Sequence, residues 1–163
     1  MNDSTLILLR ELARDARTPV AEMAAMAGLS EAEVEACIAQ LEQRGWIRGY
    51  HALVDWEKAG IDRIFAIIEV RVRPEHDVGF DAIAHRISLF DEVHSLYLMS
   101  GQYDLAAVVE GDSLKEIAAF VSEKLAPMAG VESTATSFVL KRYKTEGKIL
   151  FEEREDGRLP VTP

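Results

Sequence analysis

Apolar residues recur at helical spacing along the first 45 residues of the chain, and this pattern predicts three short helices. The first spans residues 5–15, with Ser4 placed as its N-cap. The second follows Pro19 and ends at Gly28, a residue type that adopts the left-handed conformation at helix ends without strain. The stripes that we expect to be buried are Leu6, Leu9, Leu12 and Ala13 in the first helix, Val20, Met23, Ala24 and Ala27 in the second, and Val34, Ile38 and Leu41 in the third.

The third helix begins at Ser30, because Ser30 and Glu33 have the spacing of a capping box, and it ends at Gly45. Residues 46–54 (WIRGYHALV) predict two short extended pieces around Gly49, which would form a small hairpin. Three helices, a tight turn between the second and third, and a following hairpin indicate a winged helix-turn-helix. This motif places one helix in the major groove of DNA.

From residue 64 onward the hydrophobic period changes to one typical of strands alternating with helices. The order is β-α-β-β-α-β, the ferredoxin-like split motif, so we expect an α+β protein in which a winged helix-turn-helix precedes a ferredoxin-like domain. The predicted elements are a strand at 64–72, a helix at 78–89 with Phe80, Ile83, Ala84 and Ile87 inward, strands at 93–99 and 104–110, a helix at 114–125 capped by Asp112 or Ser113, and a strand at 131–143.

The changes in pattern divide the chain into four parts. We expect a helix-turn-helix domain at 1–54, a polar linker at 55–63 and the ferredoxin-like domain at 64–144. Residues 145–163 form a charged tail, with one further strand expected at 148–152.

The composition of the chain excludes several classes of protein function. The chain has 18 Lys+Arg and 28 Asp+Glu, a net charge of −10, which excludes a polyanion binder that works by bulk charge. The single cysteine, Cys37, excludes an intrachain disulfide framework and a cysteine-based zinc site, and we expect it to be a small buried residue. No apolar run approaches the roughly 20 residues of a membrane span, and the start of the chain lacks a basic leader, so we expect a cytoplasmic protein without a membrane partner.

Motifs of catalysis are missing from the sequence. There is no G-x-S-x-G elbow, no Gly-rich phosphate loop and no carboxylate pair at a telling spacing. The four histidines are scattered, at positions 51, 76, 85 and 94, and match no metal-binding pattern. We therefore expect no enzyme, no cofactor and no bound metal.

Three segments together resemble the Lrp/AsnC family of bacterial and archaeal transcription regulators. They are residues 29–55 (LSEAEVEACIAQLEQRGWIRGYHALVD), 93–111 (VHSLYLMSGQYDLAAVVEG) and 130–144 (GVESTATSFVLKRYK). The resemblance implies an effector-binding C-terminal domain, dimers built by sheet-to-sheet packing, and often a ring of four dimers. An enzymatic branch of similar fold, the siroheme decarboxylases, uses His and Arg near the ligand pocket, and the corresponding strands here, residues 95–99 and 105–108, have neither.

The third helix is the expected reader of double-stranded DNA, yet it is acidic. Residues 1–60 hold 6 Lys+Arg and 10 Asp+Glu, a difference of −4. Two of the acids, Glu31 and Glu33, lie in the first turn, where carboxylates favour the helix dipole, and glutamate can also accept a hydrogen bond from cytosine. The DNA contacts that we predict are Arg10, Arg14, Arg17, Ser30, Glu33, Arg44 and Arg48.

Each of these residues also has an interpretation that involves no DNA contact. Each arginine can equally be a solvated surface residue, and Ser30 is better explained as a helix cap than as a DNA contact. The acidic third helix leaves two functions in competition. The first is a DNA-binding regulator that responds to a small amino acid. The second is an amino-acid-sensing oligomeric module whose DNA binding is weak or lost.

The turn between the second and third predicted strands is the candidate effector site. Gly101 permits a positive φ and close approach of a ligand, exposed N–H groups can hold a carboxylate, and Asp104 can hold an ammonium group. The resemblance places this turn at a pocket between dimers, whereas the residues alone also fit a plain β-turn. The effector contacts that we predict are Ser100, Gly101, Gln102, Asp104, Thr134 and Thr136, with Tyr97, Met99 and Val121 as apolar lining. The threonines are also ordinary strand residues, and the three apolar residues are also ordinary core.

Overall fold

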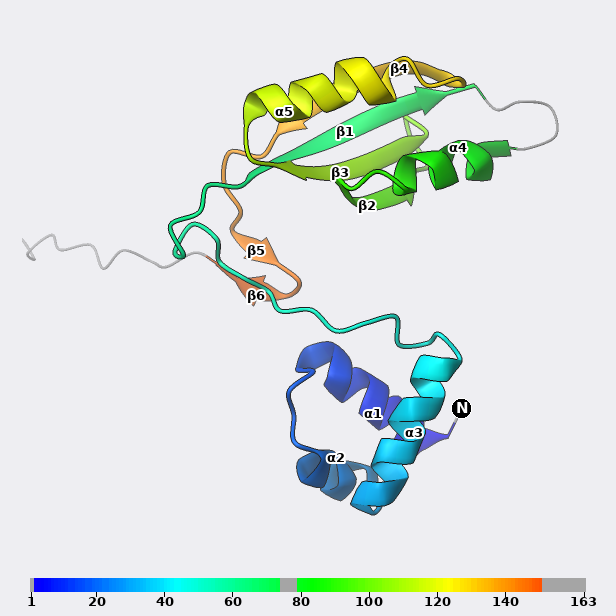
Figure 1. Ribbon diagram of the computed structural model, residues 1–163. Helices are drawn as coiled ribbons and strands as arrows, with labels where there is room; N and C mark the ends of the chain where they lie inside the picture. The colour runs from blue at the N-terminus through cyan, green and yellow to red at the C-terminus, as the bar shows by residue number, and fades with distance from the viewer. Residues whose placement is uncertain (1, 74–78, 151–163) are drawn as a thin grey trace, which may run out of the picture. The chain divides into compact units, whose positions relative to one another are not determined.

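The computed structural model describes residues 2–73 and 79–150. The chain divides into two compact units, residues 1–53 and residues 54–163. The first unit consists of three helices, α1 (Asp3–Arg14), α2 (Val20–Ala27) and α3 (Glu31–Gln43), as Figure 1 shows.

The helix ends are set by short side chains and by glycine. The side chain of Asn2 accepts a hydrogen bond from the Thr5 N–H (2.9 Å), so Asn2 is the N-cap of α1 and the predicted cap at Ser4 is wrong. Ser4 instead donates to the carbonyl of Ala27 (3.0 Å) and ties α1 to the end of α2. Gly28 ends α2 with φ of 65°, as predicted.

The core of the helical unit is small and formed by all three helices. It contains Leu8, Met23, Ala24, Ala27 and Val34, so the stripe predicted for α2 is confirmed. The stripe predicted for α1 is partly wrong, because Leu8 is fully buried and Ala13 is exposed. Leu12 of the predicted stripe does pack against this core, but the inward face also includes the acidic Glu11, which an apolar pattern cannot reveal.

The predicted hairpin after α3 is not formed within residues 46–54. This segment, described throughout, contains no strand. The N–H groups of Trp46 and Ile47 both donate to the carbonyl of Leu41 (2.9 and 3.3 Å), which extends the helix end past Gly45. A tight hairpin needs positive φ in its turn, and Gly49 does not adopt it. Pieces of about three residues also fail to hold a two-stranded ladder without a further strand.

The second unit is a four-stranded antiparallel sheet with helices on one face (Figure 1). The strand order is β2-β3-β1-β4, which is that of the ferredoxin-like fold, as predicted. Its elements are β1 (Ile64–Val72), α4 (Gly79–Ser88), β2 (Val93–Leu98), β3 (Leu105–Gly111), α5 (Leu114–Ala119), η1 (Phe120–Leu125) and β4 (Val131–Phe138).

Alternation along β1 decides which face of the sheet is covered. Ala66, Ile68, Val70 and Val72 are buried, whereas Ile67, Glu69 and Arg71 between them are exposed. The buried positions pack with inward residues of β3, α4, α5 and η1, which include Leu105, Val109, Ile83, Ile87, Ile117, Phe120 and Leu125. Among residues 54–73 and 79–150, no helix covers the opposite face of the sheet, on which Ile67, Glu69 and Arg71 are exposed (Figure 1). We call this the open face.

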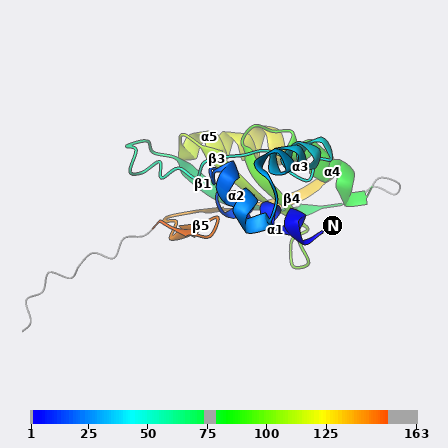
Figure 2. The same cartoon turned by 90° about the horizontal axis from the view of Figure 1, so that it is seen from below.

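Several predicted ends differ from the structure. The helix predicted at 114–125 is α-helical only to Ala119 and continues as the π-helix η1, and Ser113 rather than Asp112 is its cap. The last strand ends at Phe138. A short ladder follows outside the sheet, between β5 (Lys144–Thr145) and β6 (Lys148–Ile149), and is visible in Figure 1 and Figure 2. The strand predicted at 148–152 is therefore confirmed only for β6, and positions 151 and 152 lie outside the described residues, as does Val78 of the helix predicted at 78–89.

Candidate functional site

Ser30 and Glu33 form the capping box that the sequence predicts at the start of α3. The Glu33 N–H donates to Ser30 Oγ (3.3 Å), and Glu33 Oε2 accepts from the Ser30 N–H (2.8 Å) and hydroxyl (2.7 Å). These bonds, the backbone one first, hold the pKa of Glu33 below its ordinary value. The structure therefore places Ser30 and Glu33, two of the predicted DNA contacts, at the start of α3. There the Ser30 hydroxyl and the Glu33 carboxylate hydrogen-bond to each other and cap the helix.

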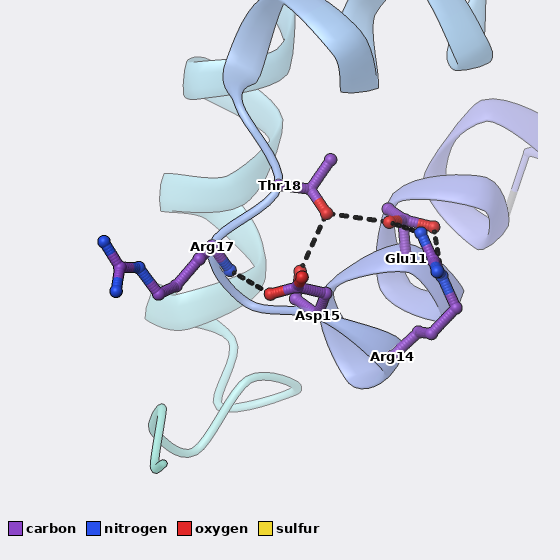
Figure 3. Close-up of polar contacts among 5 residues, drawn as sticks. All are labelled: Glu11, Arg14, Asp15, Arg17 and Thr18. Carbon is purple, nitrogen blue, oxygen red and sulfur yellow. Dashed lines mark hydrogen bonds and ion pairs between the residues drawn. The ribbon is translucent and has the colours of Figure 1, made fainter.

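Arg14, another predicted DNA contact, is bound inside the helical unit. Its Nε and Nη2 donate to the two carboxylate oxygens of Glu11 (3.0 and 2.5 Å), and the Thr18 hydroxyl donates to the same carboxylate (2.7 Å) (Figure 3). The Glu11 residue is only 8% exposed. The pKa of Glu11 is lowered, first by the bonds from Arg14 and then by the bond from Thr18. This cluster fixes the turn from α1 to α2, so the guanidinium of Arg14 has a structural partner already.

Arg17 differs from Arg14. Its backbone N–H donates to Asp15 Oδ1 (2.8 Å), while its guanidinium extends away from the cluster of Glu11, Arg14 and Thr18 (Figure 3). Arg10 is exposed on α1. These two cations are placed at the surface of the unit, where a phosphate could reach them.

The two remaining arginines lie beyond the end of α3, and both are exposed. The guanidinium carbon of Arg44 lies 5.9 Å from the centre of the Trp46 ring, a cation–π distance. The Arg48 guanidinium folds back beside Gly45. The structure therefore gathers Arg44 and Arg48 at one end of α3, and Arg10, Arg14 and Arg17 along and after α1.

The turn from β2 to β3 is tied to the neighbouring strand β1 by Asp104. The Asp104 N–H donates to the Val70 carbonyl (3.1 Å), and Asp104 Oδ2 accepts from the Val72 N–H (2.9 Å). A further bond, from the Met99 N–H to the Asp104 carbonyl (2.8 Å), closes the turn. Asp104 thus fixes the shape of the turn, and its second carboxylate oxygen has no hydrogen bond among those described.

The exposed tip of the turn consists of Ser100, Gly101 and Gln102. Gly101 does not use the positive φ that glycine permits, since it is not among the glycines in that region. A Cβ added at Gly101 would meet nothing within 4 Å. Glycine is therefore not required here by the fold, and what its small size provides is room above the turn.

Arg71 is a residue of this site that sequence reasoning missed. Its Nη2 donates to the Gln102 carbonyl (2.8 Å), and its guanidinium carbon lies 5.4 Å from the centre of the Tyr103 ring. One feature of the sequence could have indicated Arg71: it is a cation at an outward position of β1, a strand otherwise rich in β-branched residues. The pairing that brings β1 beside the turn is not visible in the sequence.

Thr134 and Thr136 do not lie beside the turn. They pair with Val70 and Ile68 of β1, and directly opposed residues share a face of the sheet, so both threonines are on the face that the helices cover. Val70 pairs in turn with Leu105 at the end of the turn. Thr134 is thus two strand spacings, about 10 Å, from the turn within one chain.

The apolar candidates divide between the two faces. Tyr97, which is 56% exposed, pairs with Ala106 and lies on the open face, and Met99 is exposed next to the turn. Val121 packs against the buried core on the helix side. Tyr97 and Met99 are therefore the two that an effector at the turn could contact.

In the described part of the chain, no three His, Cys, Asp or Glu side chains gather as a set that could hold a metal ion. Likewise, no helix of residues 2–73 and 79–150 has the length and apolar character needed to cross a membrane. Cys37 is half-buried in α3, 3.9 Å from the Thr5 hydroxyl oxygen.

Two family models match the chain. The AsnC-type helix-turn-helix domain matches residues 6–42, and the Lrp/AsnC ligand binding domain matches residues 65–149, more than half of the chain. The chain belongs to the Lrp/AsnC family of transcriptional regulators, which confirms the resemblance seen in its sequence. The matched relatives carry the names of transcriptional regulators.

Relatives of known name agree with this assignment. The chain is 43% identical over 157 residues to the HTH-type transcriptional regulator YugG of Bacillus subtilis, covering 96% of this chain and 95% of that one. It is 33% identical to the regulator LrpA of Pyrococcus abyssi, over 85% of this chain and 95% of that one.

Solved structures agree in fold. The leucine response regulatory protein LrpA of Mycobacterium tuberculosis has a TM-score of 0.74 and 27% identity, over 91% of this chain and 98% of that one. A transcriptional regulator of Neisseria meningitidis, solved as its complex with L-Met, has a TM-score of 0.70 and 26% identity, over 89% of this chain and 93% of that one.

Proposed function

We propose that this regulator binds a small amino acid at the turn of residues 99–104 and that the bound amino acid changes its DNA binding. The observation that supports this is the pair of opposite charges fixed at one turn. Arg71 is held by the Gln102 carbonyl, and Asp104 is held by the Val72 N–H. An amino acid presents a carboxylate and an ammonium group, so it needs a cation and an anion at one place.

Each group then has a role. The N–H groups of Arg71 that do not bind Gln102 donate to the effector carboxylate, together with exposed backbone N–H groups at Ser100 and Gly101. The second oxygen of Asp104 accepts from the ammonium group. Tyr97 and Met99 offer an apolar surface to the side chain, which favours a neutral or apolar amino acid, and the L-Met complex of the Neisseria regulator supports this choice.

The assembly that we propose is a dimer in which two copies pack their open sheet faces together. That face carries Ile67, which is 43% exposed, and Tyr97, with Ala106, Val108 and Ala135 on the same side. Burying such a face is favourable because apolar surface leaves water. Thr134 and Thr136 would reach an effector only from a neighbouring dimer, so their role depends on the larger ring. The assembly acts where the DNA is, in the cytoplasm.

A second candidate function is an amino-acid-sensing module that no longer reads DNA well. The observation that favours it is that Arg14 is bound to Glu11, which removes one cation from a sparse set. The two functions share the effector site and differ in whether the protein binds DNA.

Calorimetric titration of the full-length protein with each of the 20 amino acids tests the effector site. At least one neutral amino acid should bind the wild type, and Arg71→Ala should weaken it at least tenfold. The matched control is Arg73→Ala, because Arg73 is the next arginine along the chain and its partner is Glu132. Equal affinity in Arg71→Ala and Arg73→Ala would remove Arg71 from the site, and no binding by the wild type would contradict the effector proposal.

A further inference from the structure

The exposed side of α3 differs from the acidic average of its sequence. Val34 and Leu41 are buried and Cys37 and Ile38 are half-buried, which defines the inward side of the helix. On a helix with about 3.6 residues per turn, the opposite side is occupied by positions 32, 36, 39 and 43. These are Ala32, Ala36, Ala39 and Gln43, and all four are exposed.

The outward ridge of α3, which we define as these four residues with Gln40 at its edge, has no charged side chain. The carboxylates lie on its flanks. Glu31, Glu35 and Glu42 share one flank, and Glu33 lies on the other.

Two of these carboxylates have partners within the helical unit. Glu33 is engaged in the capping box with Ser30, and Glu42 accepts a hydrogen bond from the Tyr50 hydroxyl (2.9 Å). Burial, and then the bond to Glu42, raises the pKa of Tyr50. The carboxylates that argue against DNA binding therefore lie beside the surface that would face the bases, and not on it. Two of the four, those of Glu33 and Glu42, also form hydrogen bonds within the helical unit.

From this arrangement we infer that the outward ridge of α3 selects A·T base pairs in the major groove. The inference rests on the proposed function, since it requires that α3 enters the groove. A glutamine side chain matches the edge of adenine, because its amide oxygen accepts from the N6 amino group while its amide N–H donates to N7. Gln40 and Gln43 can each make this bidentate contact.

Alanine methyl groups suit the other base of the pair. The thymine C5-methyl group projects into the major groove, and an alanine side chain contacts it without losing a hydrogen bond. Guanine is read mainly by arginine or lysine, and the ridge has neither. Glu35, on the flank, is the group that could accept from a cytosine at the border of the site.

The test begins with selection of duplexes from a random pool by the full-length protein, followed by anisotropy at fixed salt. In the selected site, each thymine is replaced by deoxyuridine, which removes only the C5-methyl group. We expect binding to weaken at the thymines of both half-sites, and Gln43→Ala and Gln40→Ala each to reduce the preference for one adenine by roughly 5- to 150-fold. Ala39→Val should change the preference at a contacted thymine.

The matched control is Ala118→Val, because Ala118 is an exposed helical alanine in the other unit. It should bind like the wild type. Selected sites whose fixed positions are guanines, or binding that is indifferent to uracil and to both glutamine variants, would overturn the inference while leaving DNA binding intact. Failure of the wild type to enrich any duplex, with or without amino acids, would instead contradict the DNA-binding role itself.

Discussion

Asp104 has a structural task and a proposed binding task, and two substitutions separate them. Asp104→Ala removes the acceptor for the Val72 N–H, which then lies half-buried at the end of β1 without its partner. Losing such a bond costs about 1–3 kcal/mol. Asp104→Asn keeps an oxygen in the same place and loses only the charge.

The two variants should therefore diverge in two assays. In urea unfolding, Asp104→Ala should lower the free energy of unfolding by about 1–3 kcal/mol, and Asp104→Asn by less than about 1 kcal/mol. In calorimetry, both should lose the effector, because an amide does not replace the carboxylate that faces the ammonium group. A Tm decrease of about 4–8 °C per kcal/mol provides a second measure for a unit of this size.

Two results would refute this reasoning. If Asp104→Ala is as stable as the wild type, the bond to Val72 does not support the turn. If Asp104→Asn is stable and binds the amino acid with unchanged affinity, the carboxylate is not the partner of the ammonium group.

Three further predictions concern the stability of the two units. Leu8→Ala should destabilise the helical unit by about 2–5 kcal/mol in urea unfolding, because Leu8 is fully buried in its core; a loss below about 1 kcal/mol would contradict that burial. Because the pKa of Glu11 is lowered, its carboxylate stabilises the fold at pH values above its ordinary pKa of 4.5, and this contribution is lost as the pH falls through the lower folded-state value; Glu11→Gln should remove that part of the pH dependence of unfolding, and an unchanged acid transition would refute the assignment. Gly130→Ala should destabilise the sheet unit, because Gly130 has φ of 92° and a Cβ would lie 2.6 Å from Cδ1 of Ile83, and the matched control Gly101→Ala, with open space around it, should melt like the wild type.

Local patterns were sufficient wherever the structure depends on local interactions. The bounds of β1 at 64–72 and of α2 at 20–27 follow from the apolar period, and the capping box at Ser30 needs only residues three apart. The order of strands and helices was sufficient for the ferredoxin-like sheet, because short connections leave few topologies.

The failures arise where the position of a residue depends on polar contacts or strand pairing that an apolar pattern does not show. Glu11 is tolerated on an inward face because Arg14 and Thr18 bind its carboxylate, so the stripe of α1 could not be placed from apolar residues alone. Arg71 joins the effector turn only through the pairing of β1 with β3, which brings it to Gln102, 31 positions further along the chain. Thr134 and Thr136 lie in a strand, as predicted. They are on the helix-covered face of the sheet, and the face on which a residue lies depends on the register of strand pairing, which the sequence does not show.

The acidity of α3 illustrates the same limit. Charge counted along the sequence argues against DNA binding. The helix geometry instead separates the carboxylates from an uncharged ridge, and the contacts of Glu33 and Glu42 engage two of them. The relevant property is therefore where the charges lie on the folded helix, and not their sum.

The most direct test of the account is fluorescence anisotropy of the full-length protein with duplex DNA from its own promoter region, across a salt series and against a scrambled duplex. The account predicts specific binding that persists at physiological salt, changes when the amino acid found by calorimetry is added, and has a shallow salt dependence because few arginines are free to meet phosphates. Equal or absent binding to both duplexes, at low salt and with every amino acid present, would contradict it and favour the sensing module.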